Sequence, residues 1–244
     1  TIIEGKLETA KTEYAKYLRY YEGDNPPIID APKKDRPPDN RVPGAFARKL
    51  IDTMKGYARK PGLVSYSTKG DYIKTIKAIF DRNDEELLSA ELYTDALMNG
   101  HAYELLTVDE EAKNIDMYRI KPGDGYPVYD DTLKHRMIAF VRIAVIEQDD
   151  NDKEPEKERT VYYANQWIKY KWTNTAGDKW EWIEEERKDH PFGDVPAIDY
   201  TASMDKKPLF WAVLAFINEH DKITSSSYAD ERDRYASAYL RMLK

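Results

Sequence analysis

Cysteine is absent from this chain of 244 residues. Without it the protein has no disulfide, no thiolate zinc site and no cysteine nucleophile. Long apolar runs are missing too, because no stretch of about 18 apolar residues exists, so the sequence predicts no membrane-spanning helix. Residues 1–10 mix charged and apolar side chains and lack the basic start and apolar stretch of a signal peptide.

Glycine is scarce, at 11 residues, and no glycine-rich phosphate loop is present, neither G-x-x-x-x-G-K-S/T nor G-x-G-x-x-G. Such loops need glycine because backbone amides must approach the phosphates closely. Gly123-Asp124-Gly125 is a lone turn between predicted strands, and no G-x-S-x-G nucleophile elbow occurs. We therefore expect neither an ATPase nor a serine nucleophile of that type.

Histidine is also rare, and its four residues are far apart in the sequence: His101, His135, His190 and His220. His101 and Glu104 are three apart on a predicted strand, which places their side chains on opposite faces. The acidic run at 149–152 lacks the glycine and terminal glutamate of an EF-hand and predicts a solvated hairpin tip. We therefore assign no catalytic, cofactor-binding or metal-ligating residue, and we expect no cofactor and no enzymatic activity.

Charge and tyrosine are abundant instead. Lys and Arg number 38 against 45 Asp and Glu, which gives a net charge of −7 and a pI near 5.3. This balance argues against a non-specific nucleic-acid binder, because neutralising phosphates needs a cationic face. Charged residues make up 34% of the chain, hydrophobic residues 41%, and 19 residues are Tyr. The composition predicts a thin core and much surface, which suits an elongated part of an assembly better than a compact enzyme.

The first 40 residues predict a helix followed by a proline-rich arm. The helix has one narrow apolar stripe and ends near Gly23; the stripe is Ile3, Leu7, Ala10, Tyr14, Tyr17 and Tyr21. We interpret it as a helix packed on its own domain, with an intermolecular coiled coil as the alternative. Residues 23–40 are rich in proline, which predicts an extended arm that crosses a surface, or a plain linker.

Three helices are predicted next. The first, within 41–57, carries one apolar face: Phe46, Leu50, Ile51, Met54 and Tyr57. Pro61-Gly62 ends it, and 63–67 has the pattern of a short strand. The other two helices are predicted at 72–80 and 88–96, with Gly100 as the residue just past the last turn.

From about residue 101 to residue 200 the pattern is mostly β. Strands are predicted at 102–107, 115–120, 137–147, 160–172 and 180–185, with turns at 121–125, 148–159 and 174–178. Strands separated mostly by short turns predict an antiparallel meander. Four tryptophans lie on the two arms of one predicted hairpin: Trp167, Trp172, Trp180 and Trp182. Cross-strand aromatic pairs stabilise a hairpin by ~0.2–1 kcal/mol each, which is a sufficient structural reason for them.

The helical period returns at Pro208 and continues to the last residue. The sequence therefore predicts an α+β fold with N-terminal helices, an antiparallel β meander and then a long C-terminal helix. We divide the chain into 1–40 (helix and proline-rich arm), 41–207 (α+β domain) and 208–244 (long helix). Because the chain starts without Met and 228–244 has no Gly or Pro stop signal, we expect a fragment of a longer polypeptide.

Several segments, taken together, resemble one protein family. They are Tyr21-Glu22-Gly23-Asp24, Asn40-Arg41-Val42-Pro43, Phe46-Ala47-Arg48-Lys49-Leu50-Ile51-Asp52, Gly56-Tyr57, Val64-Ser65-Tyr66-Ser67, Ile79-Phe80-Asp81-Arg82-Asn83-Asp84-Glu85-Glu86, Gly100-His101-Ala102-Tyr103-Glu104-Leu105-Leu106, Val128-Tyr129-Asp130-Asp131-Thr132 and His190-Pro191-Phe192-Gly193-Asp194-Val195-Pro196. In this order they are similar to portal (head–tail connector) proteins of tailed bacteriophages, of the type found in siphoviruses of Gram-positive hosts. The resemblance runs from about residue 15 to near residue 240.

The resemblance implies a ring, usually of twelve subunits, at one capsid vertex, through which DNA is packaged and ejected and which joins head to tail. Residues 41–207 would form the wing, and 208–244 the first stem helix. The family's clip, second stem helix and crown are absent from this sequence. Implied partners are further copies of the chain, major capsid and scaffolding proteins, terminase and head-completion proteins, and double-stranded DNA that passes without sequence recognition, with no membrane.

The implied location is the portal vertex of the virion, and the host cytoplasm during assembly. The acidic balance agrees with a DNA channel, because a cationic wall would hold the phosphates and stall translocation. We expect the arm at 24–40 and the helix at 41–57 to contact a neighbouring subunit. Two alternatives stay open: a carbohydrate- or peptide-binding module that uses the Trp/Tyr hairpin around 160–185, and a carboxylate-dependent hydrolase with two acids in one pocket, one of raised pKa.

Overall fold

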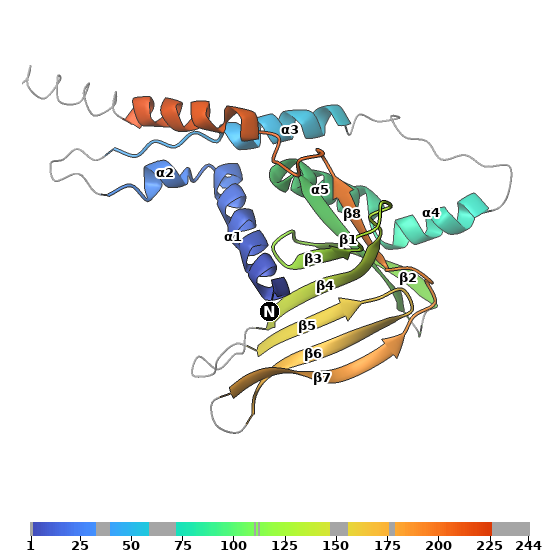
Figure 1. Ribbon diagram of the computed structural model, residues 1–244. Coiled ribbons are helices and arrows are strands. Elements are labelled where there is room, and N and C mark those ends of the chain that lie inside the picture. Colours follow the sequence, from blue (N-terminus) through green and yellow to red (C-terminus); the bar gives the residue numbers. More distant parts are fainter. Residues whose placement is uncertain are drawn as a thin grey trace, which may run out of the picture.

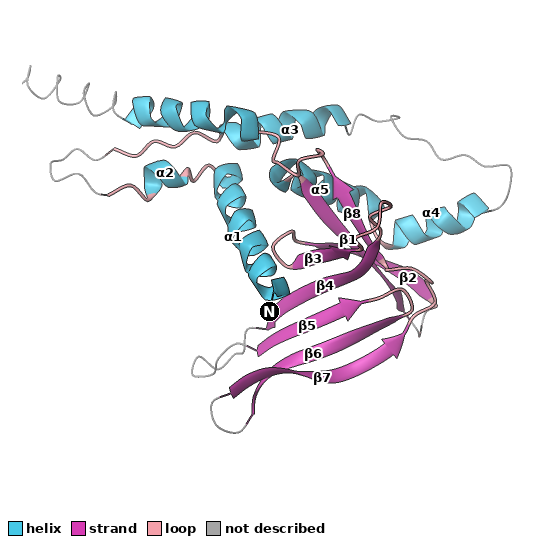
Figure 2. Cartoon of the chain, viewed as in Figure 1, coloured by secondary structure: helices cyan, strands magenta, loops and turns pink. Residues whose placement is uncertain are grey.

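The structure changes from helices to strands at Gly100, where the hydrophobic period of the sequence changes (Figure 1). The computed structural model describes residues 2–32, 40–58, 72–109, 111, 113–146, 156–175 and 179–225. Figure 2 shows the helices gathered at one end of the molecule and a broad antiparallel sheet at the other. The predicted α+β class is confirmed. Across these ranges, no helix is both long enough and apolar enough to cross a membrane.

Helix α1 (Ile2–Glu22) packs on its own chain, as predicted. Leu7 is buried against the large sheet, whereas Tyr17 and Tyr20 are buried among the other helices. The helix ends at Gly23, whose φ of +82° belongs to the left-handed region that only glycine adopts freely. The buried tyrosine at the end of the stripe is Tyr20, not the predicted Tyr21, which is only half-buried.

The start of the proline-rich arm is not extended, and that part of the prediction was wrong. Residues Pro26–Ile29 form one helical turn, α2. Proline is tolerated at the first positions of a helix because those N–H groups have no partner within the helix. Asn25, just before the turn, is 1% exposed and donates to Asp221 Oδ2 at 2.8 Å. The predicted middle of the arm, 33–39, lies outside the described residues.

Three more helices follow, close to their predicted positions: α3 (Phe46–Ala58), α4 (Tyr72–Arg82) and α5 (Glu85–Asn99). Gly100 closes α5 with a φ of +84° and donates its N–H to Ala96 O, as its predicted position requires. A side chain there would also meet the backbone of Lys206, because a Cβ would lie 2.2 Å from its carbonyl carbon. The strand predicted at 63–67 lies outside the described residues.

The large sheet is an antiparallel meander of five strands in chain order, which confirms that prediction. Its strands are β3 (Gly125–Tyr129), β4 (Met137–Ile146), β5 (Glu156–Tyr162), β6 (Gln166–Thr175) and β7 (Lys179–Asp189). The single strand predicted at 160–172 was wrong, because the chain turns at 163–165 and forms two strands. Strand β5 also begins inside the predicted loop at 148–159, of which 148–155 lies outside the described residues.

A second, three-stranded sheet has the order β2-β1-β8. It consists of β1 (His101–Asp109), β2 (Asn114–Ile120) and β8 (Ala197–Thr201), which pairs with the first half of β1. Sequence patterning did not predict β8 or β3. Strand β8 pairs with β1, from which it is separated by almost one hundred residues in the sequence, so no local pattern links the two. Strand β3 contains Pro127, and proline argues against a strand except at the edge of a sheet.

The C-terminal part returns to the helices at the top of the molecule (Figure 1). After a short 3-10 turn at Trp211–Val213, residues 214–225 are helical, and 226–244 lie outside the described residues. Phe210, at 0% exposure, and Ile217, at 6%, enter a core made with the other helices: Tyr17, Tyr20, Ala47, Ile51, Leu97 and Met98. The second half of α1 and the C-terminal part therefore share one helical core.

Candidate functional site

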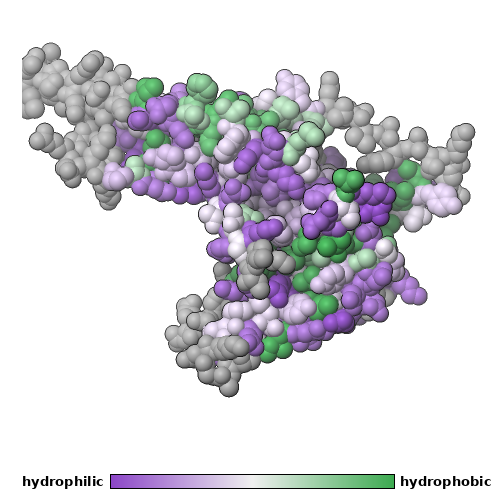
Figure 3. All heavy atoms as spheres, viewed as in Figure 1, coloured by the Kyte–Doolittle hydropathy of each residue, from purple (hydrophilic) through white to green (hydrophobic). Residues whose placement is uncertain are grey.

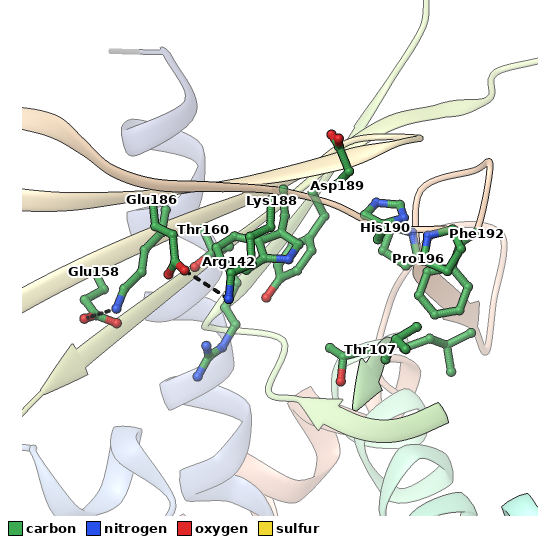
Figure 4. A pocket seen from close by; sticks show the side chains of 16 residues that line it. Thr107, Arg142, Glu158, Thr160, Glu186, Lys188, Asp189, His190, Phe192 and Pro196 are labelled. Carbon is green, nitrogen blue, oxygen red and sulfur yellow. Dashed lines mark ion pairs between the residues drawn. The ribbon is translucent and has the colours of Figure 1, made fainter. Parts of the chain in front are cut away.

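An open cleft of about 580 Å³ lies on the face of the large sheet opposite α1 (Figure 4). Successive side chains of a strand point to opposite faces, so Val141 and Val161 meet Leu7 of α1 while Arg142 and Thr160 face the cleft. Arg142, Thr160, Lys169 and Glu186 are register partners across β4, β5, β6 and β7. Pro191 and Phe192, from the loop after β7, form one end of the cleft.

Two lysines of the cleft form ion pairs with glutamates. Lys169 Nζ lies 2.7 Å from Glu158 Oε1 and 3.4 Å from Glu185 Oε2. Hydrogen bonding to Glu158 raises the pKa of Lys169. Lys188 Nζ lies 3.1 Å from Glu186 Oε1, and dashed lines in Figure 4 mark this pair and the pair of Lys169 with Glu158. These pairs make that side of the cleft a wall of salt bridges, within β7 and between neighbouring strands.

The carboxyl groups with a raised pKa lie elsewhere, at the junction of α5 and the small sheet. Burial raises the pKa of Asp95, and Arg119 opposes the rise with two hydrogen bonds, of 2.6 and 2.7 Å. Burial likewise raises the pKa of Glu104, which accepts from Tyr200 Oη at 2.6 Å. Neither acid lines the cleft. The two-acid pocket of the hydrolase alternative is therefore not formed by these residues.

The predicted tryptophan hairpin is formed by β6 and β7, and its tryptophans are half-buried, except Trp180, which is exposed. Trp172 and Trp182 are register partners with ring centres 5.0 Å apart. Trp182 Nε1 donates to Glu4 Oε1 of α1 at 2.7 Å, and the Arg159 guanidinium lies 4.5 Å from its ring centre. These contacts hold α1 on the sheet, which is a structural use of the aromatic side chains.

The four histidines occupy four separate environments. His101 lies on β1, where burial lowers its pKa. Because His101 and Glu104 are three apart on this strand, their side chains lie on opposite faces of the sheet, as predicted. His135 stacks on Tyr129, with ring centres 4.5 Å apart. His190 contacts Tyr163 O through Nε2 at the cleft, and His220 meets Phe46. Among the described residues, no group of three or more His, Cys, Asp or Glu could hold a metal ion.

The helices expose an apolar stripe to solvent. We define the helix stripe as five residues of α3 and of the helix at 214–225, exposed between 40% and 75%: Phe46, Leu50, Met54, Phe216 and Ile223. Figure 3 shows hydrophobic side chains gathered over these two helices. The ring centres of Phe46 and His220 are 4.7 Å apart. His220 lies about one turn after Phe216, on the same side of its helix. Exposed apolar groups that gather on one face mark a protein contact surface.

Buried polar contacts hold the second helix of the stripe in place. Besides the bond from Asn25 to Asp221, Tyr20 Oη donates to Asn218 Oδ1 at 3.1 Å, and Val42 N donates to Ser225 Oγ at 3.0 Å. Because these bonds hold one side of the helix at 214–225 against the body, Phe216 and Ile223 on its other side face solvent. The sequence predicted the apolar face of α3 but included Ile51, which is fully buried.

A mixed body of helices and antiparallel sheets that exposes an apolar stripe is typical of a protein that assembles with others. The chain belongs to the family described as phage portal protein, SPP1 Gp6-like, which it matches over residues 2–243. No curated protein matches the chain. Membership confirms the predicted structural role in the phage portal.

Proteins of this family are structural, form oligomeric rings at the portal vertex of the virion and contact capsid and DNA. The portal is the channel through which DNA is packaged and ejected, and it joins head to tail. In the part of the chain that the structure describes, nothing in the cleft or in the tryptophan hairpin favours the hydrolase alternative or the carbohydrate- or peptide-binding alternative.

Proposed function

We propose that this chain is the wing and the start of the stem of a portal ring from a siphovirus of a Gram-positive host, and that it is not an enzyme. The observation that carries the proposal is the family match, because it extends over almost the whole chain and not over one motif. Residues 41–207 correspond to the wing and 208–244 to the beginning of the first stem helix. The helix core supports this arrangement, since Phe210 and Ile217 anchor the C-terminal part on the body.

The partners in this proposal are eleven further copies of the chain, the major capsid and scaffolding proteins, the terminase and the head-completion proteins. Double-stranded DNA passes through the channel without base recognition. The net charge of −7 supports sliding, because it provides no excess of cations to hold the phosphates. Assembly takes place in the host cytoplasm before the ring becomes part of the virion.

The test is native mass spectrometry of this chain beside the complete gene product. We expect the complete product to give a single species of about twelve subunits and the 244-residue chain a smaller assembly. A monomer at both lengths, at every concentration that can be measured, would refute the proposal.

The arm at 24–40 and helix α3 remain our proposed contacts with a neighbour. Deleting 24–38 should reduce ring assembly, but it also removes Asn25, whose buried amide contacts Asp221 within the same chain. A second deletion, of residues 33–38 alone, keeps Asn25 and so tests the arm without breaking that contact. Rings that form normally with the shorter deletion would show that the arm makes no intersubunit contact.

A further inference from the structure

Strand β4 continues beyond its neighbour β3, so one of its edges is open near its C-terminal end. Gly125, the first residue of β3, pairs with Arg142, whereas the last part of β4, at 143–146, has β5 as its partner among the described strands. Figure 1 shows this end of β4 beside the start of α1. An open edge presents backbone N–H and C=O groups that can pair with another chain.

The backbone of Val145 directs its hydrogen-bonding groups toward the open side. Ile143 N donates to Asp124 O on that side at 2.9 Å. Alternate residues of a strand direct their backbone groups to the same side, so the N–H and C=O of Val145 point as those of Ile143 do. Asp124 N turns back to donate to Lys121 O at 2.8 Å, and no described residue bonds to Val145 on that side. A backbone donor and acceptor are therefore available there.

The open part of β4 lacks the charged side chains by which proteins protect sheet edges. Every residue at 143–146 is apolar, and Val145 and Ile146 are 46% and 40% exposed. Strand β7, at the other end of the same sheet, is different, because every residue at 184–189 is charged. Charges on an edge prevent unwanted pairing. The edge of β4 is therefore suited to accept a strand, and the edge of β7 is not.

Two grooves meet at this edge. The first, of about 260 Å³, lies between β4 and α1, where Leu7 forms part of its wall. The second, of about 410 Å³, runs along the open side between β4 and the turn at 121–124 and reaches Arg142 on the opposite face. Ile143 and Val145 line both grooves. Because successive side chains of a strand point to opposite faces, an added strand would direct one set toward α1 and the other toward the face of Arg142.

The two grooves differ in charge. The charged lining of the second groove is Lys11, Arg119, Lys121, Arg142 and Asp124. Arg119 is paired with Asp95 and Glu91, but the other three cations form no ion pair with a described residue. The first groove has a mixed lining of apolar and charged side chains, with Glu4, Glu8 and Asp124 beside Lys11 and Lys157. Acidic side chains are therefore favoured in the second groove, where cations are in excess, and apolar ones beside Leu7 in the first.

We propose that the open edge of β4 accepts an extended segment of another protein, which carries acidic residues on one face and apolar residues on the other. The segment pairs with the backbone of Val145 as an added strand, so main-chain bonds give affinity and the two grooves give specificity. A second copy bound through the same edge would bring Lys11 and Lys121 toward their own counterparts, which charge disfavours. The tryptophan hairpin closes the far end of the first groove and keeps its structural role. This contact does not depend on a closed ring.

The probe is a short fluorescent peptide that alternates glutamate with valine, added to the full 244-residue chain. Binding measured by fluorescence anisotropy should saturate and weaken as salt is added. Hydrogen exchange at 143–146 should slow, because the N–H of Val145 gains a partner. Two control peptides separate the causes. One has lysine in place of glutamate, and the other has proline in place of the central valine, which keeps the charge but removes a backbone donor.

Matched variants of the chain test the backbone and the charge separately. Val145→Pro removes the donor on the open side and no bond to β5, and proline is tolerated at such an edge, so the fold should survive while binding weakens at least about tenfold. Val145→Thr keeps the donor and should bind like the natural chain. Lys11→Glu should weaken binding, whereas Lys16→Glu makes the same change on the same helix outside both grooves and should not. Circular dichroism checks that each variant is folded.

Three results would overturn the proposal. The first is equal affinity of the peptide for Val145→Pro and for the natural chain, and the second is unchanged hydrogen exchange at 143–146 in the bound state. The third is equal binding of the glutamate and lysine peptides, or no binding of either at millimolar concentration. If the chain instead associates with itself and Val145→Pro abolishes this association without any peptide binding, the edge belongs to a second copy and the acidic segment is wrong.

Discussion

Replacing Arg119 by Met should destabilise the protein strongly, because it leaves a buried carboxylate without its partner. Asp95 has a side chain that is 0% exposed, and Arg119, which is 26% exposed, donates to both of its oxygens. Breaking a buried ion pair by removing one partner costs about 3–5 kcal/mol. The total free energy of unfolding of a domain is about 5–15 kcal/mol, so the loss should be a large fraction of it.

The size of this loss should depend on pH, with a sign that burial determines. Burial already raises the pKa of Asp95, and losing Arg119 removes the group that opposes the rise. A carboxyl whose pKa is higher in the folded chain than in the unfolded chain stabilises the fold at low pH and loses that contribution as the pH rises. Arg119→Met should therefore lose more stability at pH 8 than at pH 5.

Urea unfolding followed by tryptophan fluorescence and circular dichroism measures both effects. The double variant Asp95→Leu/Arg119→Met should recover much of the loss, because no charge is then left buried. Arg82→Met is the control: Arg82 pairs with Asp109 and Asp116 at the surface, and its loss should move the urea midpoint far less. An Arg119→Met protein within about 1 kcal/mol of the natural chain at pH 8 would refute this reasoning.

Two further predictions concern the helical core and a buried glutamate. Phe210→Ala should cost about 3–5 kcal/mol, because Phe210 is fully buried, whereas Phe216→Ala, at a side chain that is 75% exposed, should stay within about 0.5 kcal/mol; equal losses in urea unfolding would contradict the assigned burial. Glu104→Gln keeps an acceptor for Tyr200 and removes a carboxyl whose pKa burial raises. Since that carboxyl stabilises the fold only at low pH, the variant should gain stability relative to the natural chain as the pH rises above about 4.5, and parallel pH curves would show that Glu104 does not titrate differently on folding.

Local patterns predicted the elements best where the chain alternates in one clear period. Helices α1, α3 and α5 and the long strand β4 lie close to their predicted bounds, because each has a regular apolar face. The ends set by glycine were also predicted, since the backbone at Gly23 and Gly100 has a positive φ. The turn at 163–165 was not predicted because the residues on both sides of it favour strands. Its position depends on the antiparallel pairing of β5 with β6, which the local sequence does not show.

The surfaces proposed for assembly were only partly visible in the sequence. The apolar face of α3 follows from its spacing, but spacing did not separate the buried Ile51 from the exposed Leu50.

By itself, the sequence determined the α+β class, the order of helices and meander, and the resemblance to portal proteins, because these depend on periodicity, turn residues and ordered segments within the chain. Only the tertiary structure decided that β8 completes a second sheet beside β1, and that the second half of α1 shares one helical core with the C-terminal part. It also showed that Asp95 and Glu104, two acids whose pKa burial raises, lie outside the cleft. Each of these depends on contacts between distant residues, which local spacing does not record, and on burial, which is a property of the packed molecule.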